Sequence, residues 1–376
     1  MVSRADDSIL IAGAGPAGLT LALELARRGI KVRIVERDEG VVPISESRAL
    51  GVNARTLALL EPSGVTEPLL AEAIPLEEFR VQSADKQLLK IRPADLGGRF
   101  PALCILPQGL TERLLLERLR SYDIEPEWQT SITTIEGGVE APLATLLSGD
   151  GSGEMVRPNM LVGADGAHSL VRKSCGFDFP GEALESRFFL ADFRYAETVD
   201  TGFAEINLQN PGVLGRLPVR PDVLRYISTL PDFERRIIHP SHPLEETWRS
   251  DFRVSFRHVE PMSRGKVYLL GDAAHVHSPI GARGMNLGIE DACWLAWLIS
   301  QGREAEFSQL RLPSVRKVLA QTRRLTGLIT IENPLALALR NNLFALVGTM
   351  PPIARLALRN ISGLDTPAPT WIDSAT

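Results

Sequence analysis

Hydrophobic and polar positions near the start of the chain follow a strand–helix–strand pattern. Residues 9–12 (ILIA) form a short apolar run that is typical of a buried parallel strand, and the glycine-rich sequence GAGPAG follows directly. Apolar residues at helical spacing then predict a helix that ends at Gly29, and KVRIVE at 31–36 predicts a second strand. This order predicts a βαβ unit with a tight glycine turn.

The glycines of this turn have the spacing that a dinucleotide requires. Gly13 permits the tight turn, Gly15 lets the backbone approach a pyrophosphate, and Gly18 lets the helix and strand pack closely. The helix N-terminus then faces the anion. Glu36 ends the second strand about 20 residues further on, where a carboxylate accepts hydrogen bonds from a ribose diol. The unit predicts a dinucleotide site without separating FAD from NAD.

Two later apolar runs also end in an acidic residue. The sequence MLVGADGAHSLVRK at 160–173 is an apolar strand that runs into Asp165, and VYLLGD at 267–272 is a strand that ends in Asp272. A glycine-rich turn follows, and apolar positions between 289 and 299 recur at helical spacing. Open α/β sheets bind ligands at the carboxyl ends of their strands, so both acids are candidate site residues.

The middle of the chain has the alternating pattern of short strands. Runs such as FFLADFRY, RLPVR and LRYISTL are bounded by prolines and glycines, and they predict an antiparallel sheet. We therefore predict an α/β fold in which a Rossmann-like domain of the GxGxxG type carries an inserted, mostly antiparallel domain. The predicted nucleotide-binding domain comprises residues 1–74, 107–180 and 265–376, and the predicted inserted domain comprises residues 75–106 and 181–264.

The C-terminal region from about residue 305 is predicted to be helical, with a break at Pro351 and Pro352. Its apolar residues recur at helical spacing, so we expect these helices to pack on the nucleotide-binding domain. A dimer face or a helix at a membrane surface is the alternative.

Composition narrows the class of protein. A formal net charge of -5 and a pI near 5.8 give no global attraction to nucleic acid. No apolar run approaches the roughly 18 residues that span a bilayer, and the N-terminus lacks a signal sequence, so we expect a cytoplasmic protein without an integral membrane segment. Cys104, Cys175 and Cys293 form no CxxC pair, and we expect no metal site.

The three motifs together resemble a known family. An N-terminal GxGxxG, a central DG motif and a late GD motif occur in this order in the single-component FAD-dependent aromatic hydroxylases of the p-hydroxybenzoate hydroxylase type, the group A flavoprotein monooxygenases. The resemblance covers residues from about 9 to 300. It implies that Asp272 contacts the ribityl chain of FAD, and that the DG loop with Asp165 serves the FAD site near the approach of the nicotinamide nucleotide.

Further cofactor residues are implied by the same resemblance. The segment SRALGVNARTLALLE at 47–61 is similar to a family segment whose arginine, here Arg48, reaches the phosphate or ribose of FAD; Arg55 lies one helix face onward. Gln108 resembles a glutamine near the flavin. The alternatives are a surface arginine and a simple polar residue at a helix start. The other expected cofactor contacts are Ala17, Arg37, Gly284, Met285 and Asn286.

The resemblance also implies the chemistry. FAD is reduced by NADPH or NADH and reacts with dioxygen, and a flavin C(4a)-hydroperoxide hydroxylates an aromatic or phenol-like substrate. Peptide NH groups of the turn at 281–286 would stabilise charge on the reduced flavin, although this turn reads Gly-Ala-Arg-Gly where the family commonly has Gly-Gln-Gly. His277, His275 and Pro279 are the candidate catalytic residues, with a packed histidine as the alternative. His168 is the candidate at the nicotinamide approach.

Several readings stay open at this stage. A Baeyer–Villiger oxygenase, a prenyl-chain reductase and a non-catalytic flavin-binding protein use the same scaffold. In the inserted domain, Arg220, Arg225 and Tyr226 are either ligand contacts or solvated side chains. The expected partners are a small-molecule aromatic substrate and dioxygen, with no nucleic acid, and the protein is expected to be a monomer or a homodimer.

Overall fold

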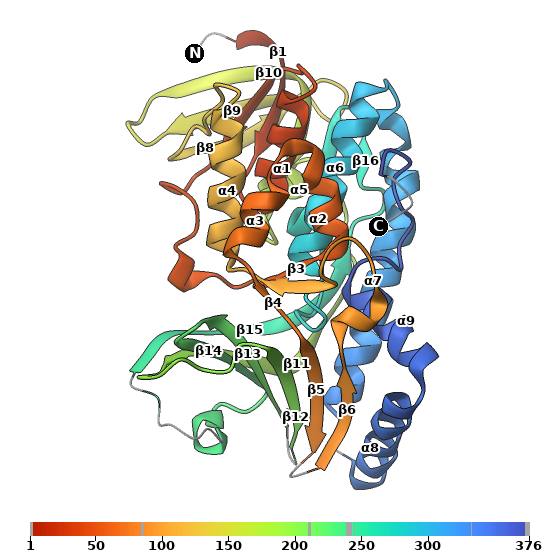
Figure 1. The fold of residues 1–376 in the computed structure, drawn as a ribbon. Coiled ribbons are helices and arrows are strands. Elements are labelled where there is room, and N and C mark those ends of the chain that lie inside the picture. Colours follow the sequence, from red (N-terminus) through yellow and green to blue (C-terminus); the bar gives the residue numbers. More distant parts are fainter. Residues whose placement is uncertain are drawn as a thin grey trace.

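The computed structural model describes residues 3–83, 86–209, 212–237, 243, 245–331 and 333–372. A first sheet, at the top of Figure 1, has the strand order β16-β17-β10-β1-β2, with β9 and β8 extending it from β10. Strands β17, β10, β1 and β2 are parallel, as the βαβ pattern predicts. Its strands are β1 (Ser3–Ala12), β2 (Val32–Val35), β8 (Thr130–Glu136), β9 (Leu143–Ser148), β10 (Gly153–Gly163), β16 (Ser263–Arg264) and β17 (Val267–Leu269).

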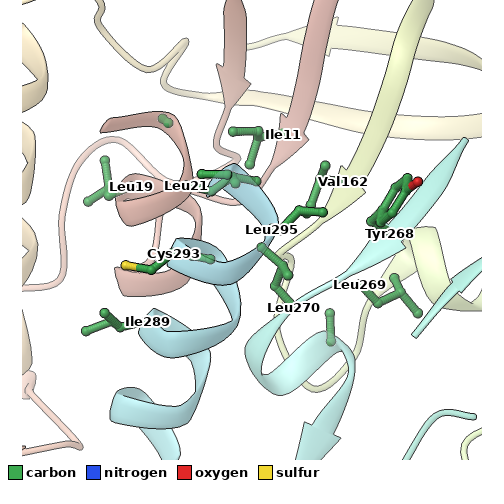
Figure 2. Packing of buried hydrophobic residues seen from close by; sticks show 14 of the residues in the cluster. Ile11, Leu19, Leu21, Val162, Tyr268, Leu269, Leu270, Ile289, Cys293 and Leu295 are labelled. Carbon is green, nitrogen blue, oxygen red and sulfur yellow. The ribbon is translucent and has the colours of Figure 1, made fainter. Parts of the chain in front are cut away.

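Helices α1 (Pro16–Ala26) and α6 (Gly284–Ser300) pack side by side on this sheet. Their apolar faces meet strand residues in one fully buried cluster, in which Figure 2 shows Leu19 and Leu21 of α1, Ile289 and Leu295 of α6, and Val162 of β10. Burial of such side chains contributes about 1.5–3 kcal/mol each. The remaining helices of this region are α2 (Ala54–Leu60), α3 (Thr66–Glu72), α4 (Gln108–Arg120) and α5 (Leu170–Ser174).

Small residues set the distance between α1 and α6. A Cβ atom on Gly288 of α6 would lie 3.1 Å from the Cα of Gly271 and 3.4 Å from the Cβ of Ala17 on α1. Ala17, expected at the cofactor, therefore has its side chain at this helix contact. The close approach holds the turn that follows β17 against the first turn of α1 and against α6.

A second sheet forms the lower part of the molecule, with the order β18-β15-β11-β14-β13-β12-β5-β6. Its neighbouring strands are antiparallel except for the parallel pair β12 and β5, which agrees with the predicted pattern. Its strands are β5 (Glu78–Ser83), β6 (Lys86–Ile91), β11 (Gly181–Arg194), β12 (Phe203–Leu208), β13 (Val213–Arg220), β14 (Val223–Ser228), β15 (Glu245–His258) and β18 (His275–Val276).

A small sheet connects the two regions. It has the order β3-β7-β4, formed by β3 (Gly51–Asn53), β4 (Ile74–Pro75) and β7 (Leu103–Ile105). Strand β18 joins the second sheet although residues 275–276 fall within the predicted nucleotide-binding range. The exact division into domains stays a prediction.

The C-terminal helices are α7 (Phe307–Ile329), α8 (Pro334–Thr349) and α9 (Pro351–Ile361). Helix α7 packs against α6 and β15. The expectation that all of these helices pack on the nucleotide-binding domain is wrong for α8, which lies on β6. Helix α9 contacts the short helix η3 (Pro93–Leu96), and the carbonyl oxygen of Asn360 at its end accepts a hydrogen bond from Arg283 at the start of α6. Helical periodicity shows that one face is buried, but it does not identify the surface that buries it. None of the helices among the described residues combines the length and apolarity needed to cross a membrane.

Candidate functional site

A cavity of about 780 Å³ opens where β1, β2 and β10 of the first sheet end, and Trp248, Arg249 and Ser250 of the second sheet line its other side. The three motifs identified in the sequence meet here, because parallel strands end at the same edge of a sheet. The predicted site residues that line the cavity are Gly13, Gly15, Glu36, Arg37, Arg48, Gln108, Asp165, His168 and Asp272.

The glycine turn has the shape that a diphosphate needs. Gly13 has a φ of +103°, and a Cβ there would also meet the main chain of Ala164; a Cβ on Gly18 would overlap the carbonyl oxygen of Gly13. A Cβ on Gly15, in contrast, would meet nothing within 4 Å. The turn is therefore packed by main chain on one side and open to the cavity on the other, at the N-terminus of α1, where the first NH groups have no intrahelical partner.

Glu36 lies beside this turn at the end of β2. Its carboxylate accepts hydrogen bonds from the NH of Ala14 (2.7 Å) and the NH of Asp38 (3.1 Å). These bonds fix the carboxylate among the residues that line the cavity. Arg37 is exposed at the cavity rim.

Asp165 follows β10 and caps α5. One carboxylate oxygen accepts from the NH groups of Leu170 (2.7 Å) and Val171 (3.1 Å), and the other oxygen is buried without a hydrogen-bond partner among the described residues. Arg172 donates to the carbonyl oxygens of Ala167 (2.8 Å) and Ala273 (3.0 Å), and thus ties the DG loop to the GD loop. The sequence analysis did not single out Arg172.

Asp272 and Arg48 lie on the cavity wall, and both are exposed to it. The surrounding protein desolvates Asp272 and raises its pKa, an effect that the positive charges of His275 and Arg48 oppose. A carboxylate in this position is suited to accept hydrogen bonds from hydroxyl groups.

The main chain at Arg48 is held by a buried ion pair from the second sheet. Arg225 contacts both carboxylate oxygens of Asp192, at 2.7 and 2.8 Å, and donates to the carbonyl oxygens of Ser47 (2.6 Å) and Arg48 (3.1 Å). Its guanidinium group also lies 4.4 Å from the ring centre of Trp248. Arg225 is only 1% exposed, so the expectation of a solvated side chain is wrong for this residue.

The other two residues singled out in the second sheet lie elsewhere. The hydroxyl of Tyr226 is 3.0 Å from that of Tyr195 in a buried pair, and burial raises the pKa of Tyr226 well above its usual range. Arg220 is exposed, as the solvated alternative expected.

Gln108, at the start of α4, is oriented by a buried acid that the sequence analysis missed. Its amide donates to Glu112 (2.9 Å), whose second oxygen accepts from the NH of Val42 (2.9 Å). Burial raises the pKa of Glu112. The signal was present: Glu112 follows Gln108 at the i, i+4 spacing that places two side chains together on a helix.

The two candidate histidines have different surroundings. His275 is buried, and its Nε2 lies 2.6 Å from Asp291; the same carboxylate binds Arg311 at 2.8 Å, and Arg311 also binds Glu290 at 2.8 Å. Although burial opposes it, the charges of Arg311 and His275 lower the pKa of Asp291. His275 thus joins a buried ionic cluster between α6 and α7 and does not line the cavity, so the structure favours the packed-histidine alternative for it.

His277 lies beside the first residue of α6. Its Nδ1 is 2.8 Å from the carbonyl oxygen of Ser278, and its Nε2 is buried with no partner in the described part of the chain. Burial lowers the pKa of His277 to about 4. The ring is therefore neutral at pH 7, with the proton on Nδ1 donated to Ser278, which leaves Nε2 as a hydrogen-bond acceptor. Pro279, two residues on, is exposed.

Several expected cofactor residues lie away from the cavity. Asn286 is buried and bonds to the main chain of Gly51 (2.8 Å) and Asn53 (3.0 Å), while the half-buried Met285 packs against the first hydrophobic core. Arg55 is buried and donates to the carbonyl oxygen of Thr366 (3.2 Å). The side chains of Asn286 and Arg55 therefore hold segments together, and a cofactor contact by Gly284, Met285 or Asn286 stays a prediction.

Comparisons with known proteins cover nearly the whole chain. The model of the FAD binding domain family matches residues 6–236 and 225–306. 6-Methylpretetramide 4-monooxygenase of Streptomyces rimosus is 32% identical over 97% of this chain and 70% of the relative. Pentachlorophenol 4-monooxygenase of Sphingobium chlorophenolicum is 28% identical over 80% of this chain and 60% of the relative. The solved structure of OxyS anhydrotetracycline hydroxylase from Streptomyces rimosus has a TM-score of 0.79 and 29% identity, covering 96% of this chain and 77% of that one.

Proposed function

The chain belongs to the FAD binding domain family, and on this basis we propose that it is an FAD-dependent monooxygenase that uses NAD(P)H and dioxygen to hydroxylate a phenol-like aromatic molecule. The observation that carries this proposal is the cavity in which the GxGxxG turn, the DG loop and the GD loop meet. These motifs come from parts of the chain more than 250 residues apart (Gly13 to Asp272) and supply the donors and acceptors that suit one extended dinucleotide.

The residues on the cavity wall fit FAD in a definite direction. The open side of Gly15 and the N-terminus of α1 would hold the pyrophosphate. Glu36 would accept hydrogen bonds from the adenosine ribose, and Asp272 would accept them from the ribityl hydroxyls. Arg48 is a cation on the wall that would face a phosphate or the flavin ring.

Bound FAD would supply hydride transfer from NAD(P)H and the activation of dioxygen. The protein shields the reacting region from water. Ile280, next to Pro279, packs against the apolar cluster of Phe188, Val254 and Phe256 in the second sheet. An apolar wall beside the turn at 278–284 favours an aromatic ring as substrate and disfavours water near the reacting atoms.

His277 stays the candidate for contact with the substrate hydroxyl, although neither His277 nor Pro279 is among the residues that line the cavity. The free Nε2 of His277 is an acceptor beside this turn. Because its pKa is about 4, the ring is neutral at pH 7, and Nε2 would polarise a phenol by accepting a hydrogen bond from it. His168, which is exposed at the cavity rim, stays the candidate for nicotinamide contact.

The relatives guide the choice of substrates to test. Their names refer to pentachlorophenol, a single ring, and to 6-methylpretetramide and anhydrotetracycline. We therefore include simple phenols and fused-ring phenols in the substrate class. A cytoplasmic location stays a prediction.

Oxidation of NAD(P)H by the FAD-loaded protein tests the proposal. A phenol from the panel should stimulate it, and mass spectrometry after reaction under labelled dioxygen should find one labelled atom in a new hydroxyl group. A labelled ester or lactone would identify a Baeyer–Villiger oxygenase instead. Failure of every phenol to stimulate oxidation, in a protein that retains FAD, would contradict the proposed activity.

A further inference from the structure

Six large apolar side chains are exposed on the hairpin of α8 and α9. Among the described residues, only one other large apolar side chain, Leu147 on β9, is comparably exposed. Such a concentration on one element marks an interaction surface, whereas single exposed leucines are common. The exposed fractions are 72% for Leu339, 57% for Leu356, 54% for Leu346, 45% for Leu343, 39% for Met350 and 38% for Ile353.

Helical geometry places the exposed residues of α8 on one face. Leu339, Leu343 and Leu346 follow one another at intervals of four and three residues, which is the spacing of a single stripe along a helix. Met350 directly follows the end of α8. The opposite face is buried: Phe344 and others there pack against β6. Helix α8 thus has two apolar faces, and the second sheet covers only one of them.

The charges on this hairpin have one sign. From 333 to 364 the sequence contains three arginines and no aspartate or glutamate, although the whole protein has a formal net charge of -5. Arg340 is buried, whereas Arg355 and Arg359 are exposed and donate to the carbonyl oxygens of Leu96 (3.4 Å) and Leu364 (2.8 Å). Main-chain carbonyls orient these two arginines but do not neutralise them.

Lys86 adds a further cation close to the hairpin. It is exposed at the start of β6 and lines a cavity of about 210 Å³ together with Asn341 and Asn342 of α8. The nearest short helix, η3, carries the exposed Asp95 beneath α9. The exposed hairpin itself is apolar and cationic, and Figure 1 shows it at the lower end of the molecule beside β6.

We propose that the α8–α9 hairpin docks this protein on the surface of a bilayer that contains anionic phospholipid. Leucine, methionine and isoleucine on one face with arginine and no acid is the composition of helices that lie in the membrane interface. The hairpin lies flat on the surface and does not span the bilayer. This surface is separate from the cavity, and the inference goes beyond the proposed hydroxylation.

Charge also separates this occupant from a second copy of the chain. In a two-fold symmetric dimer the patch meets a copy of itself, so a hairpin that carries arginines and no carboxylate would face a second hairpin of the same charge. Anionic headgroups provide the complementary charge directly.

Flotation of the FAD-loaded protein with phospholipid vesicles tests the proposal. The protein should float with phosphatidylcholine vesicles that contain about one third phosphatidylglycerol, and it should float less in about 1 M salt, where the screening length is about 3 Å. Replacing Leu339, Leu343 and Leu356 together by Gln should reduce partitioning about tenfold or more. Leu147→Gln, a change of equal chemistry on another exposed leucine, should leave it unchanged.

Arginine variants and the oligomeric state in sedimentation provide two further tests of the proposal. Replacing Arg355 and Arg359 by Gln should remove the preference for anionic over neutral vesicles, and FAD absorbance should show that each variant is folded. Absence of flotation of the unmodified protein with anionic vesicles would overturn the proposal. So would an unmodified dimer in sedimentation that becomes a monomer in the triple leucine variant, since a second copy would then occupy the surface.

Discussion

Alanine substitutions at two glycines of the GxGxxG turn should affect different properties of the protein, its folding stability at Gly18 and its binding of FAD at Gly15. A Cβ on Gly18 would lie well within 3.0 Å of the carbonyl oxygen of Gly13, a distance that real Cβ atoms do not reach, and both groups belong to packed main chain. A Cβ on Gly15 would meet nothing within 4 Å and would project toward the cavity. Gly18→Ala is therefore expected to strain the fold itself, and Gly15→Ala only the bound cofactor.

The expected magnitudes differ accordingly. Overpacking of this kind costs about 1–3 kcal/mol, and the overlap with rigid main chain places Gly18→Ala at about 3 kcal/mol in the free energy of unfolding. Gly15 has a φ of -73°, which alanine adopts freely, so Gly15→Ala should change that free energy by about 1 kcal/mol or less. Obstruction of the pyrophosphate should nevertheless weaken FAD binding by about tenfold or more.

Urea unfolding of the apoprotein, followed by circular dichroism, measures the first effect, and titration with FAD measures the second. The reasoning would be refuted if the apoproteins of Gly18→Ala and Gly15→Ala unfolded with equal stability. It would also be refuted if Gly15→Ala bound FAD as tightly as the unmodified protein.

Three other changes test separate parts of the site. Asp272→Ala should weaken FAD binding about 10- to 100-fold in a fluorescence titration, because a hydrogen bond to a charged group contributes about 1.5–3 kcal/mol; an unchanged dissociation constant would contradict its role. Asp192→Asn should cost about 3–5 kcal/mol in urea unfolding, because Arg225 then stays buried without its counter-charge. Asp251→Asn breaks an exposed pair and should cost less than about 1 kcal/mol, so equal losses would oppose this reasoning. The pKa of His277 is lowered in the folded state, so the unfolded state binds the extra proton between pH 6.5 and about 4, and folding stability should fall by about 3 kcal/mol on acidification through that range. His277→Asn should remove that part of the pH dependence, and an unaltered slope would show that other groups cause it.

The predicted residues that the structure brings together on the cavity wall are those for which chemistry dictates residue type and spacing together. Only glycine suits the positions of Gly13 and Gly18, and an acid at a strand end is recognisable because a parallel sheet brings strand ends to one edge. Glu36, Asp165 and Asp272 were found in this way, although they are spread over more than 200 residues.

The histidines show where such reasoning stops. His275 and His277 are two residues apart and have the same intrinsic chemistry, but strand β18 ends between them at Val276. His275 is directed into the buried cluster with Asp291 and Arg311, and His277 follows the chain toward the first turn of α6. Their surroundings depend on where a two-residue strand ends, and no periodicity in the sequence marks that point.

The ion pair of Arg225 and Asp192 is a second example in which the sequence pattern does not reveal the surroundings of a side chain. In the sequence both residues stand in short alternating strands, where a buried and a solvated charge have the same pattern. The register of β11 and β14 places them directly opposite one another, and a shift of one residue would turn each to the other face of the sheet. Because Arg225 of this pair donates to the carbonyl oxygens of Ser47 and Arg48, the register of the second sheet fixes the position of Arg48, a proposed cofactor contact on the cavity wall. A change of register in the second sheet should therefore impair FAD binding even where every motif residue is intact.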